Sequence, residues 1–166
     1  MARGINTKCT HLEEDEQSIK NYGAISYPIY QTATYAHMGV GRSTGFDYSR
    51  LQNPTNDAVA EKICELEGGV AAMLTSSGQA ANFYTIANLC QAGDHIVCSA
   101  KVYGGTFNLY AATIHKIGME CTFVDPDAPA EEIDKAFRPN TKAVVGETIA
   151  NPALTILDIE KFAKLA

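Results

Sequence analysis

The feature that most restricts the fold of this 166-residue chain is an alternation of short apolar runs with amphipathic segments, which begins near residue 55. The apolar runs, rich in Val and Ile, are predicted strands at 70–74, 95–98, 120–124 and 142–146. Helices are predicted around them at 56–67, 77–89, 106–117, 130–137 and from 158 onward. Continuously apolar strands are typical of sheets that are covered on both faces. The alternation therefore predicts an α/β fold with a mostly parallel, doubly wound sheet.

The N-terminal third of the chain lacks this alternation. Residues 1–54 are predicted to form an extended arm, with an acidic helical turn at 13–16 and a glycine-rich loop at 39–45. Residues 55–166 are predicted to form the first portion of an α/β domain. Because the chain stops inside its last predicted helix, we expect it to be part of a longer protein and its sheet to have exposed edges.

Composition and charge exclude several classes of partner. The formal net charge is -6 and Lys and Arg form no cluster, so nucleic acid is not an expected partner, because phosphate neutralisation needs clustered positive charge. No apolar run approaches the ~20 residues that span a bilayer, and the first residues lack the apolar stretch of a secretory signal. We therefore expect a cytoplasmic protein with no membrane partner.

Cysteine and histidine spacing argues against a metal centre. The five cysteines include no C-x-x-C pair, and the four histidines are scattered without metal-ligand spacing, so we predict no metal site and reduced thiols. Cys64, Cys90 and Cys98 lie in apolar segments and are interpreted as small buried hydrophobic residues.

A helix start follows the first predicted strand. Ligands of open α/β sheets bind beyond the carboxyl ends of the strands, and Ser77, Gly78 and Gln79 lie there. Free backbone N–H groups and the helix dipole favour an anion at such a position, and Gly78 lets a phosphate approach closely. The alternative is that Ser77 only caps the helix.

Polar residues also follow two other predicted strands. Tyr103 precedes two glycines, which leave room for its ring to lie flat against a planar ligand. Glu147 is a candidate hydrogen-bonding group at a strand exit, and Asn151 is a second, followed by the rigid Pro152. The alternatives are that Tyr103 is an ordinary loop tyrosine and that Glu147 is an exposed carboxylate without a partner.

Tyr48 and Arg50 form a further candidate pair before the regular region. In an extended segment their alternate spacing points both side chains the same way. A phenol beside a guanidinium suits phosphate, because arginine offers a planar fork of donors. The alternative is a surface arginine stacked on a tyrosine.

The glycine-rich loop at 39–45 does not match a nucleotide-binding motif. Its last glycine is one place late for G-x-G-x-x-G, and no predicted strand precedes it and no helix follows it. A dinucleotide-binding oxidoreductase is therefore disfavoured.

Together these segments resemble the pyridoxal-phosphate-dependent transsulfuration enzymes from about residue 7 to residue 166. The motifs that carry the resemblance, in order, are Tyr48-Ser49-Arg50, Asn53-Pro54-Thr55, Leu66-Glu67-Gly68-Gly69, Ser76-Ser77-Gly78-Gln79-Ala80-Ala81, Tyr103-Gly104-Gly105-Thr106 and Glu147-Thr148-Ile149-Ala150-Asn151-Pro152. The resemblance implies part of the large domain of a fold-type I transferase that uses pyridoxal 5′-phosphate (PLP). Within the family, the segments at 76–81, 103–109 and 147–154 are most similar to O-acetylhomoserine sulfhydrylases.

The resemblance implies cofactor-binding roles for the residues at the strand ends. Gly78 and Gln79 are expected to bind the cofactor phosphate through backbone N–H groups, with Ser77 beside them. Glu147 and Asn151 are expected near the ring and its 3′ oxygen.

It also implies roles for three residues with long side chains. Tyr103 is expected to stack on the pyridine ring and to be catalytic. Tyr48 and Arg50 are expected to reach the phosphate held by a neighbouring subunit, and Tyr48 to help activate the substrate. The expected assembly is a homo-oligomer, a dimer of dimers, whose sites are shared between subunits.

The implied activity is γ-replacement on O-acetylhomoserine with sulfide, which gives homocysteine for methionine biosynthesis. Family members carry an Asp that pairs with the ring nitrogen and a Lys that forms a Schiff base, both in segments beyond residue 166, so this chain alone is expected to be inactive. Lys101 is the only positional substitute, and it is interpreted as a surface lysine. The alternatives are methionine γ-lyase or a cystathionine γ-synthase or lyase of the same family, and a non-catalytic α/β module that binds a phosphorylated ligand or serves in assembly.

Overall fold

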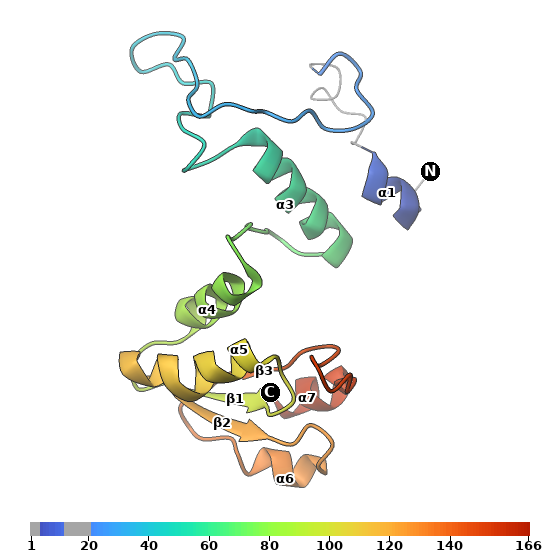
Figure 1. The fold of residues 1–166 in the computed structure, drawn as a ribbon, viewed down its shortest axis with the longest axis vertical. Helices are drawn as coiled ribbons and strands as arrows, with labels where there is room; N and C mark the ends of the chain where they lie inside the picture. The colour runs from blue at the N-terminus through green and yellow to red at the C-terminus, as the bar shows by residue number, and fades with distance from the viewer. Residues whose placement is uncertain (1–3, 12–20) are drawn as a thin grey trace. The chain divides into compact units, whose positions relative to one another are not determined.

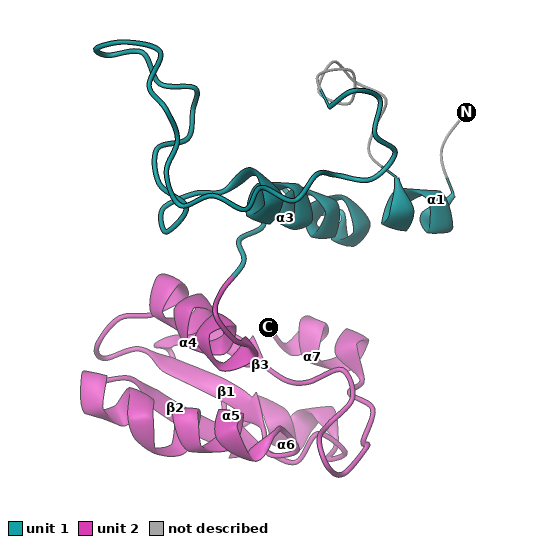
Figure 2. Ribbon diagram, turned by 45° about the horizontal axis from the view of Figure 1, so that its top comes forward, with its two compact units in different colours: residues 1–74 teal, residues 75–166 magenta. Residues whose placement is uncertain are grey.

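The computed structural model describes residues 4–11 and 21–166 (Figure 1), and the acidic turn predicted at 13–16 lies outside them. The chain divides into two compact units, Met1–Leu74 (unit 1) and Thr75–Ala166 (unit 2), which Figure 2 colours separately. The division at residue 54 that we expected for a longer parent protein stays a prediction. None of the helices in the described part has the length and apolar character needed to cross a membrane.

Unit 2 is built on a parallel three-stranded sheet with the order β2-β1-β3. The strands are β1 (His95–Ser99), β2 (Glu120–Val124) and β3 (Thr141–Val145). Every residue of the central strand β1 is buried, and its Val97 lies opposite Thr122 on one side and Val144 on the other. The parallel strands predicted from the three later apolar runs are thus confirmed to within a residue or two.

Helices lie on both sides of this sheet. They are α4 (Gly78–Leu89), α5 (Gly104–Asn108), the π-helix η1 (Leu109–Thr113), the 3₁₀ helix η2 (Ile114–Ile117), α6 (Ala130–Asp134) and α7 (Ile159–Leu165). Figure 1 shows α4 and α5 on one side of the sheet and α6 on the other, as a doubly wound fold requires. On the first side Ile86, Ile96, Tyr110 and Ile114 form the centre of the core.

The helix predicted at 106–117 begins two residues earlier and changes its winding along its length. It runs as α5, η1 and η2 without a break and ends where Gly118 adopts a left-handed conformation, with φ of 83°. A Cβ atom at Gly118 would lie 2.9 Å from the Cβ atom of Ala92, so this position has room only for glycine.

The part of unit 1 that the structure describes has little regular structure besides α3 (Pro54–Glu67) and α1 (Ile5–Thr10). The side chain of Asn53 caps α3 and Gly68 ends it in a left-handed conformation. The helix predicted at 56–67 therefore begins two residues earlier, at Pro54. The helix α1 was not predicted, since we expected this region to be irregular.

The strand predicted at 70–74 is wrong. The segment carries no strand assignment, and Val70 and Met73 are exposed. A strand is stable only when its backbone pairs with a neighbour, and no other described segment pairs with this one. The segment is apolar, as its sequence shows, but the described part of the chain supplies no partner strand for it.

Candidate functional site

The start of α4 has an open backbone surface. The hydroxyl oxygen of Ser77 accepts a hydrogen bond from the backbone N–H of Ala80 at 3.1 Å, which confirms that Ser77 caps the helix. The N–H groups of Gly78 and Gln79 have no acceptor in the described part of the chain. A Cβ atom added at Gly78 would meet no atom within 4 Å. Capping and anion binding are therefore compatible here, because the cap leaves two N–H groups free.

Glu147 joins two segments of unit 2, the one that follows β1 and the one that follows β3. Its Oε1 accepts the backbone N–H of Tyr103 at 2.9 Å and lies 3.4 Å from the hydroxyl oxygen of Thr106. Its Oε2 accepts the backbone N–H of Asn151 at 3.4 Å. The residues that follow β1 and β3 are thus held together at the carboxyl edge of the sheet by one carboxylate.

Helix α4 is tied to the same carboxylate through Thr106. The side-chain amides of Gln79 and Asn82 each lie 3.1 Å from the Thr106 hydroxyl oxygen. Sequence reasoning missed Asn82 and gave Thr106 no role of its own. The available signal was the position of Thr106 directly after two glycines at a helix start.

The ring of Tyr103 lies against a glycine. Tyr103 is half-exposed, and a Cβ atom at Gly105 would lie 2.5 Å from its Cε1 atom. Gly105 therefore leaves the space that the ring occupies, as the sequence suggested. Stacking on a ligand stays a prediction.

Tyr48 and Arg50 lie in unit 1 and contact each other. The backbone pairs Tyr48 with Thr34, but a turn follows at once, in which the N–H of Leu51 donates to the Tyr48 carbonyl oxygen. The predicted extended geometry through Arg50 is therefore wrong. The Arg50 guanidinium carbon lies 5.0 Å from the centre of the Tyr48 ring, a cation–π contact. Among the described residues, Arg50 makes no ion pair with a carboxylate.

Asn53 organises the segment that carries this pair. Its Nδ2 donates toward the Tyr30 carbonyl oxygen, the Tyr35 hydroxyl and the Ser49 hydroxyl at 3.2, 3.1 and 3.0 Å. Its Oδ1 accepts the N–H of Thr55 at 2.8 Å. One buried amide thus joins the cap of α3 to both sides of the arm, which sequence reasoning did not foresee.

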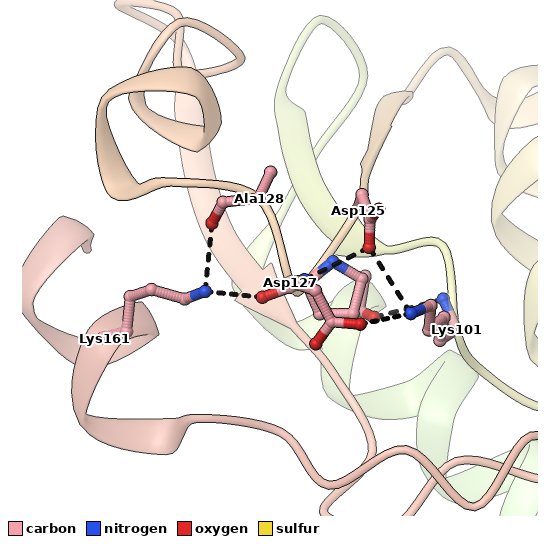
Figure 3. Close-up of polar contacts among 7 residues, drawn as sticks. Lys101, Asp125, Asp127, Ala128 and Lys161 are labelled. Carbon is pink, nitrogen blue, oxygen red and sulfur yellow. Dashed lines mark hydrogen bonds and ion pairs between the residues drawn. The ribbon is translucent and has the colours of Figure 1, made fainter.

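Lys101 is not a nucleophilic amine in this structure. Figure 3 shows its ammonium between Asp125, at 3.6 Å, and Asp127. The hydrogen bond to Asp127 and the charges of both carboxylates raise the pKa of Lys101, which keeps the amine protonated. Lys161 holds the same loop, since its ammonium donates to the carbonyl oxygens of Pro126 and Ala128 at 2.5 and 3.1 Å. The interpretation of Lys101 as a surface lysine agrees with these ion pairs.

A cavity of about 480 Å³ in unit 1 does not contain the candidate residues of unit 2. It lies between α3 and residues 69–72, and Asp57, Glu61 and Glu65 line it. Glu65 is paired with Lys8 and Lys62, but no described lysine or arginine lines the cavity to compensate Asp57 and Glu61, so it is a poor candidate for a phosphate site.

Comparison with known proteins identifies a family. The family model for "Cys/Met metabolism PLP-dependent enzyme" matches residues 6–166. Cystathionine gamma-lyase of Bacillus subtilis is 44% identical over 144 residues, which cover 87% of this chain and 38% of that protein. O-acetyl-L-homoserine sulfhydrylase of Corynebacterium glutamicum is 41% identical over 172 residues, which cover 98% of this chain and 39% of that protein.

A solved structure agrees with the sequence comparison. A putative O-acetylhomoserine (thiol)-lyase from Campylobacter jejuni has a TM-score of 0.84 and 34% identity, covering 99% of this chain and 42% of that one. That structure is described as containing N'-pyridoxyl-lysine-5'-monophosphate at position 205. The chain spans about two fifths of the length of the relatives it matches.

Proposed function

The chain belongs to the Cys/Met metabolism PLP-dependent enzymes, and from that premise we propose that it forms the part of a γ-replacement enzyme that holds the cofactor phosphate and one face of its ring. The observation that carries the proposal is the Glu147 carboxylate, which fixes the residues after β1 and β3 at one edge of the sheet. Ligands of open α/β sheets bind at this edge.

The residues at this edge fit the cofactor. The N–H groups of Gly78 and Gln79, which have no acceptor among the described residues, are donors for the phosphate, and no described side chain lies within 4 Å of a Cβ atom added at Gly78. The half-exposed ring of Tyr103 offers a flat apolar face for the pyridine ring. PLP, when bound, supplies an electron sink for negative charge that develops on the substrate.

Each candidate residue of unit 2 then has a definite role in binding the cofactor. Gly78 and Gln79 bind the phosphate through their N–H groups, and Ser77 keeps the helix start in register. Tyr103 orients the ring. Glu147 and Asn151 lie in the segment that follows β3, where they are available to the polar edge of the ring.

Tyr48 and Arg50 complete the proposed site from a second copy of the chain. Arg50 has no carboxylate partner in the described part, and it is oriented by the Tyr48 ring at 5.0 Å. A preoriented guanidinium without a partner charge suits a phosphate. We therefore propose a homo-oligomer, a dimer of dimers, in which Tyr48 also assists activation of the substrate.

The proposed reaction is replacement of the acetate of O-acetylhomoserine by sulfide, which gives homocysteine. The sulfhydrylase of C. glutamicum supports it at 41% identity over 98% of this chain. The lyase of B. subtilis, at 44% identity, supports cleavage of cystathionine as the second candidate. A cytoplasmic location follows from either metabolic role.

The binding proposal is tested by titrating the ¹⁵N-labelled chain with PLP and following its amide resonances. The resonances of Gly78, Gln79 and Tyr103 should shift together with one dissociation constant. Gly78→Val puts a branched side chain into the proposed phosphate space, where its Cβ atom would meet no described atom within 4 Å, and should abolish the shifts. Gly4→Val adds the same side chain to equally open backbone in unit 1 and serves as the control. Shifts that are absent in the unchanged chain would refute the proposal.

The reaction is tested in a full-length protein that contains this chain. Formation of homocysteine from O-acetylhomoserine and sulfide is the expected product assay. Cleavage of cystathionine without this replacement would favour the lyase.

A further inference from the structure

Thr106 lies at the centre of the hydrogen bonds that join α4 to Glu147, the second residue after β3. It is the third residue of α5 and only 2% exposed. Burying a hydroxyl destabilises the fold unless the hydroxyl is hydrogen-bonded, so the partners of Thr106 are needed to keep it buried. Its partners are three polar side chains from two other parts of unit 2: Gln79, Asn82 and Glu147.

The direction of each hydrogen bond follows from counting protons. A threonine hydroxyl has one proton to donate and two lone pairs that accept. The amides of Gln79 and Asn82, both at 3.1 Å, occupy the lone pairs. The one remaining proton is left for Oε1 of Glu147 at 3.4 Å. The chain of hydrogen bonds therefore runs in one direction, from two amides through a hydroxyl to a carboxylate.

These hydrogen bonds fix two residues that the proposed function uses, Gln79 and Glu147. Gln79 contributes its backbone N–H at the start of α4, and its side chain is anchored to Thr106. Oε1 of Glu147 accepts the hydrogen bond of the Thr106 hydroxyl, and the same oxygen accepts the N–H of Tyr103. The geometry also explains the neighbouring glycine, because a Cβ atom at Gly105 would lie 3.3 Å from Nε2 of Gln79.

We infer that Thr106 is a positioning residue, whose buried hydroxyl holds the N–H groups at the start of α4 and the carboxylate of Glu147 at a fixed separation. The inference rests on the proposed function, in which these two groups contact opposite ends of one PLP molecule. The Thr106 hydroxyl is buried and engaged by three protein side chains, so we assign it no contact with the cofactor. Its effect is to keep both contacts available at the same time.

The test is the PLP affinity of this 166-residue chain, measured from the amide shifts of Gly78 and Gln79. Thr106→Val keeps the shape and removes the hydroxyl, and it should weaken PLP binding about five- to tenfold, the effect of one or two hydrogen bonds. Thr106→Ser restores the hydroxyl and should restore the affinity. Thr113→Val makes the same substitution at an exposed position and serves as the control.

The side-chain amide resonances of Gln79 and Asn82 give a second readout that needs no ligand. Both should move in Thr106→Val and return in Thr106→Ser. If Thr106→Val does not fold, Gln79→Met removes one donor from a half-buried position and should weaken binding in the same direction.

The possible results separate the inference from the function. Unchanged affinity in Thr106→Val, with the unchanged chain binding PLP, would overturn the role of Thr106 and leave the function standing. Absence of binding by the unchanged chain would overturn the function and the role of Thr106 with it. Weaker binding in Thr106→Val that serine does not rescue would also count against the hydroxyl.

Discussion

The two units hold their candidate residues in place by different means. In unit 2 a parallel sheet with a buried central strand brings Tyr103 and Glu147 to one edge, where the Glu147 carboxylate accepts the backbone N–H of Tyr103. In unit 1 the pair Tyr48 and Arg50 is carried by an arm whose described residues form two isolated bridges, and Asn53 joins this arm to α3. A sheet positions residues through many shared backbone contacts, whereas the arm depends on a few polar contacts. The two regions should therefore respond differently to the same kind of substitution.

The largest expected difference comes from the hydrophobic core. Ile114 is fully buried in the core of unit 2, whereas Ile63 on α3 is 47% exposed. Ile114→Ala should cost about 2–5 kcal/mol of the free energy of unfolding of unit 2, because it removes packed atoms and leaves a cavity. Ile63→Ala should change unit 1 by about 0.5 kcal/mol. Urea unfolding, followed by amide exchange in each unit, measures both, and equal losses would contradict the comparison.

The next effect is a dependence of unit 2 on pH through His95. The ring is fully buried and lies 2.8 Å from the hydroxyls of both Thr141 and Thr122, which joins the three strands. Burial lowers the pKa of His95, and the charge of Arg138 adds to this, while Glu120 opposes it. The folded chain therefore keeps the ring neutral at a pH where the unfolded chain, with a pKa of about 6.5, takes up a proton.

The sign of this effect follows directly. Neutral His95 contributes its full stability above about pH 6.5. This stability is lost as the pH falls toward the lower pKa of His95 in the folded chain, by at most about 1.4 kcal/mol per pH unit. Thermal unfolding of unit 2 between pH 7.5 and 5 measures it, with those two values chosen to bracket the unfolded pKa of about 6.5. His95→Gln should remove the dependence, and His115→Gln, at an exposed position, should leave it intact. A dependence that survives in His95→Gln would assign it to another group.

How far the sequence predicts the fold depends on whether a segment has its partner within the chain. The apolar runs near Val97 and Val144 were correctly predicted as strands, because they pair with each other in unit 2. The run at 70–74 is also apolar, but it has no partner among the described segments and forms no strand. Composition predicts the ability to pair, and only the rest of the sheet decides whether pairing occurs.

The candidate site shows a similar limit. The rule that ligands bind beyond strand ends selected Tyr103 and Glu147, which the structure joins through a 2.9 Å hydrogen bond. It did not select Thr106, Asn82 or Asn53, because a polar residue within or beside a helix has the same sequence signature whether it is exposed or buried. Their importance comes from burial among other polar groups, which depends on tertiary contacts.

Asn53 allows capping and arm anchoring to be separated. Asn53→Asp keeps the oxygen that accepts the Thr55 N–H and loses the donor that reaches Tyr30, Tyr35 and Ser49. It should leave α3 intact and raise the amide exchange of Tyr35 and Ser49 about fivefold, as expected for a loss of about 1 kcal/mol.

Asn53→Ala removes both functions of the side chain and gives the reference for that result. It should destabilise α3 by a further ~1 kcal/mol, the usual contribution of a cap. Equal amide exchange of the arm in the unchanged chain and in Asn53→Asp would show that other contacts hold the arm.

Gly105→Ala is expected to be a smaller and more local change in unit 2. The added Cβ atom would lie 2.5 Å from Cε1 of Tyr103, and the half-exposed ring has room to move away. The overall fold should therefore remain, with a stability change near 0.5 kcal/mol, while the ring and the Gln79 amide shift their resonances. Gly104→Ala, where a Cβ atom meets nothing within 4 Å, is the matched control. Identical spectra for both variants would show that Tyr103 does not rest on Gly105.

The smallest expected effect concerns Lys101, and it tests whether unit 2 carries a reactive amine of its own. The raised pKa of Lys101 keeps its ammonium protonated, and only a neutral amine attacks an aldehyde. Labelling with PLP, fixed by borohydride and mapped by peptide mass, should therefore modify Lys101 less than exposed Lys116, which has no acidic partner among the described residues. Asp127→Asn removes one of the two carboxylates and should raise the labelling of Lys101. Preferential labelling of Lys101 in the unchanged chain would mean that unit 2 activates this amine, and a lysine from beyond this chain would then be unnecessary for covalent attachment of the cofactor.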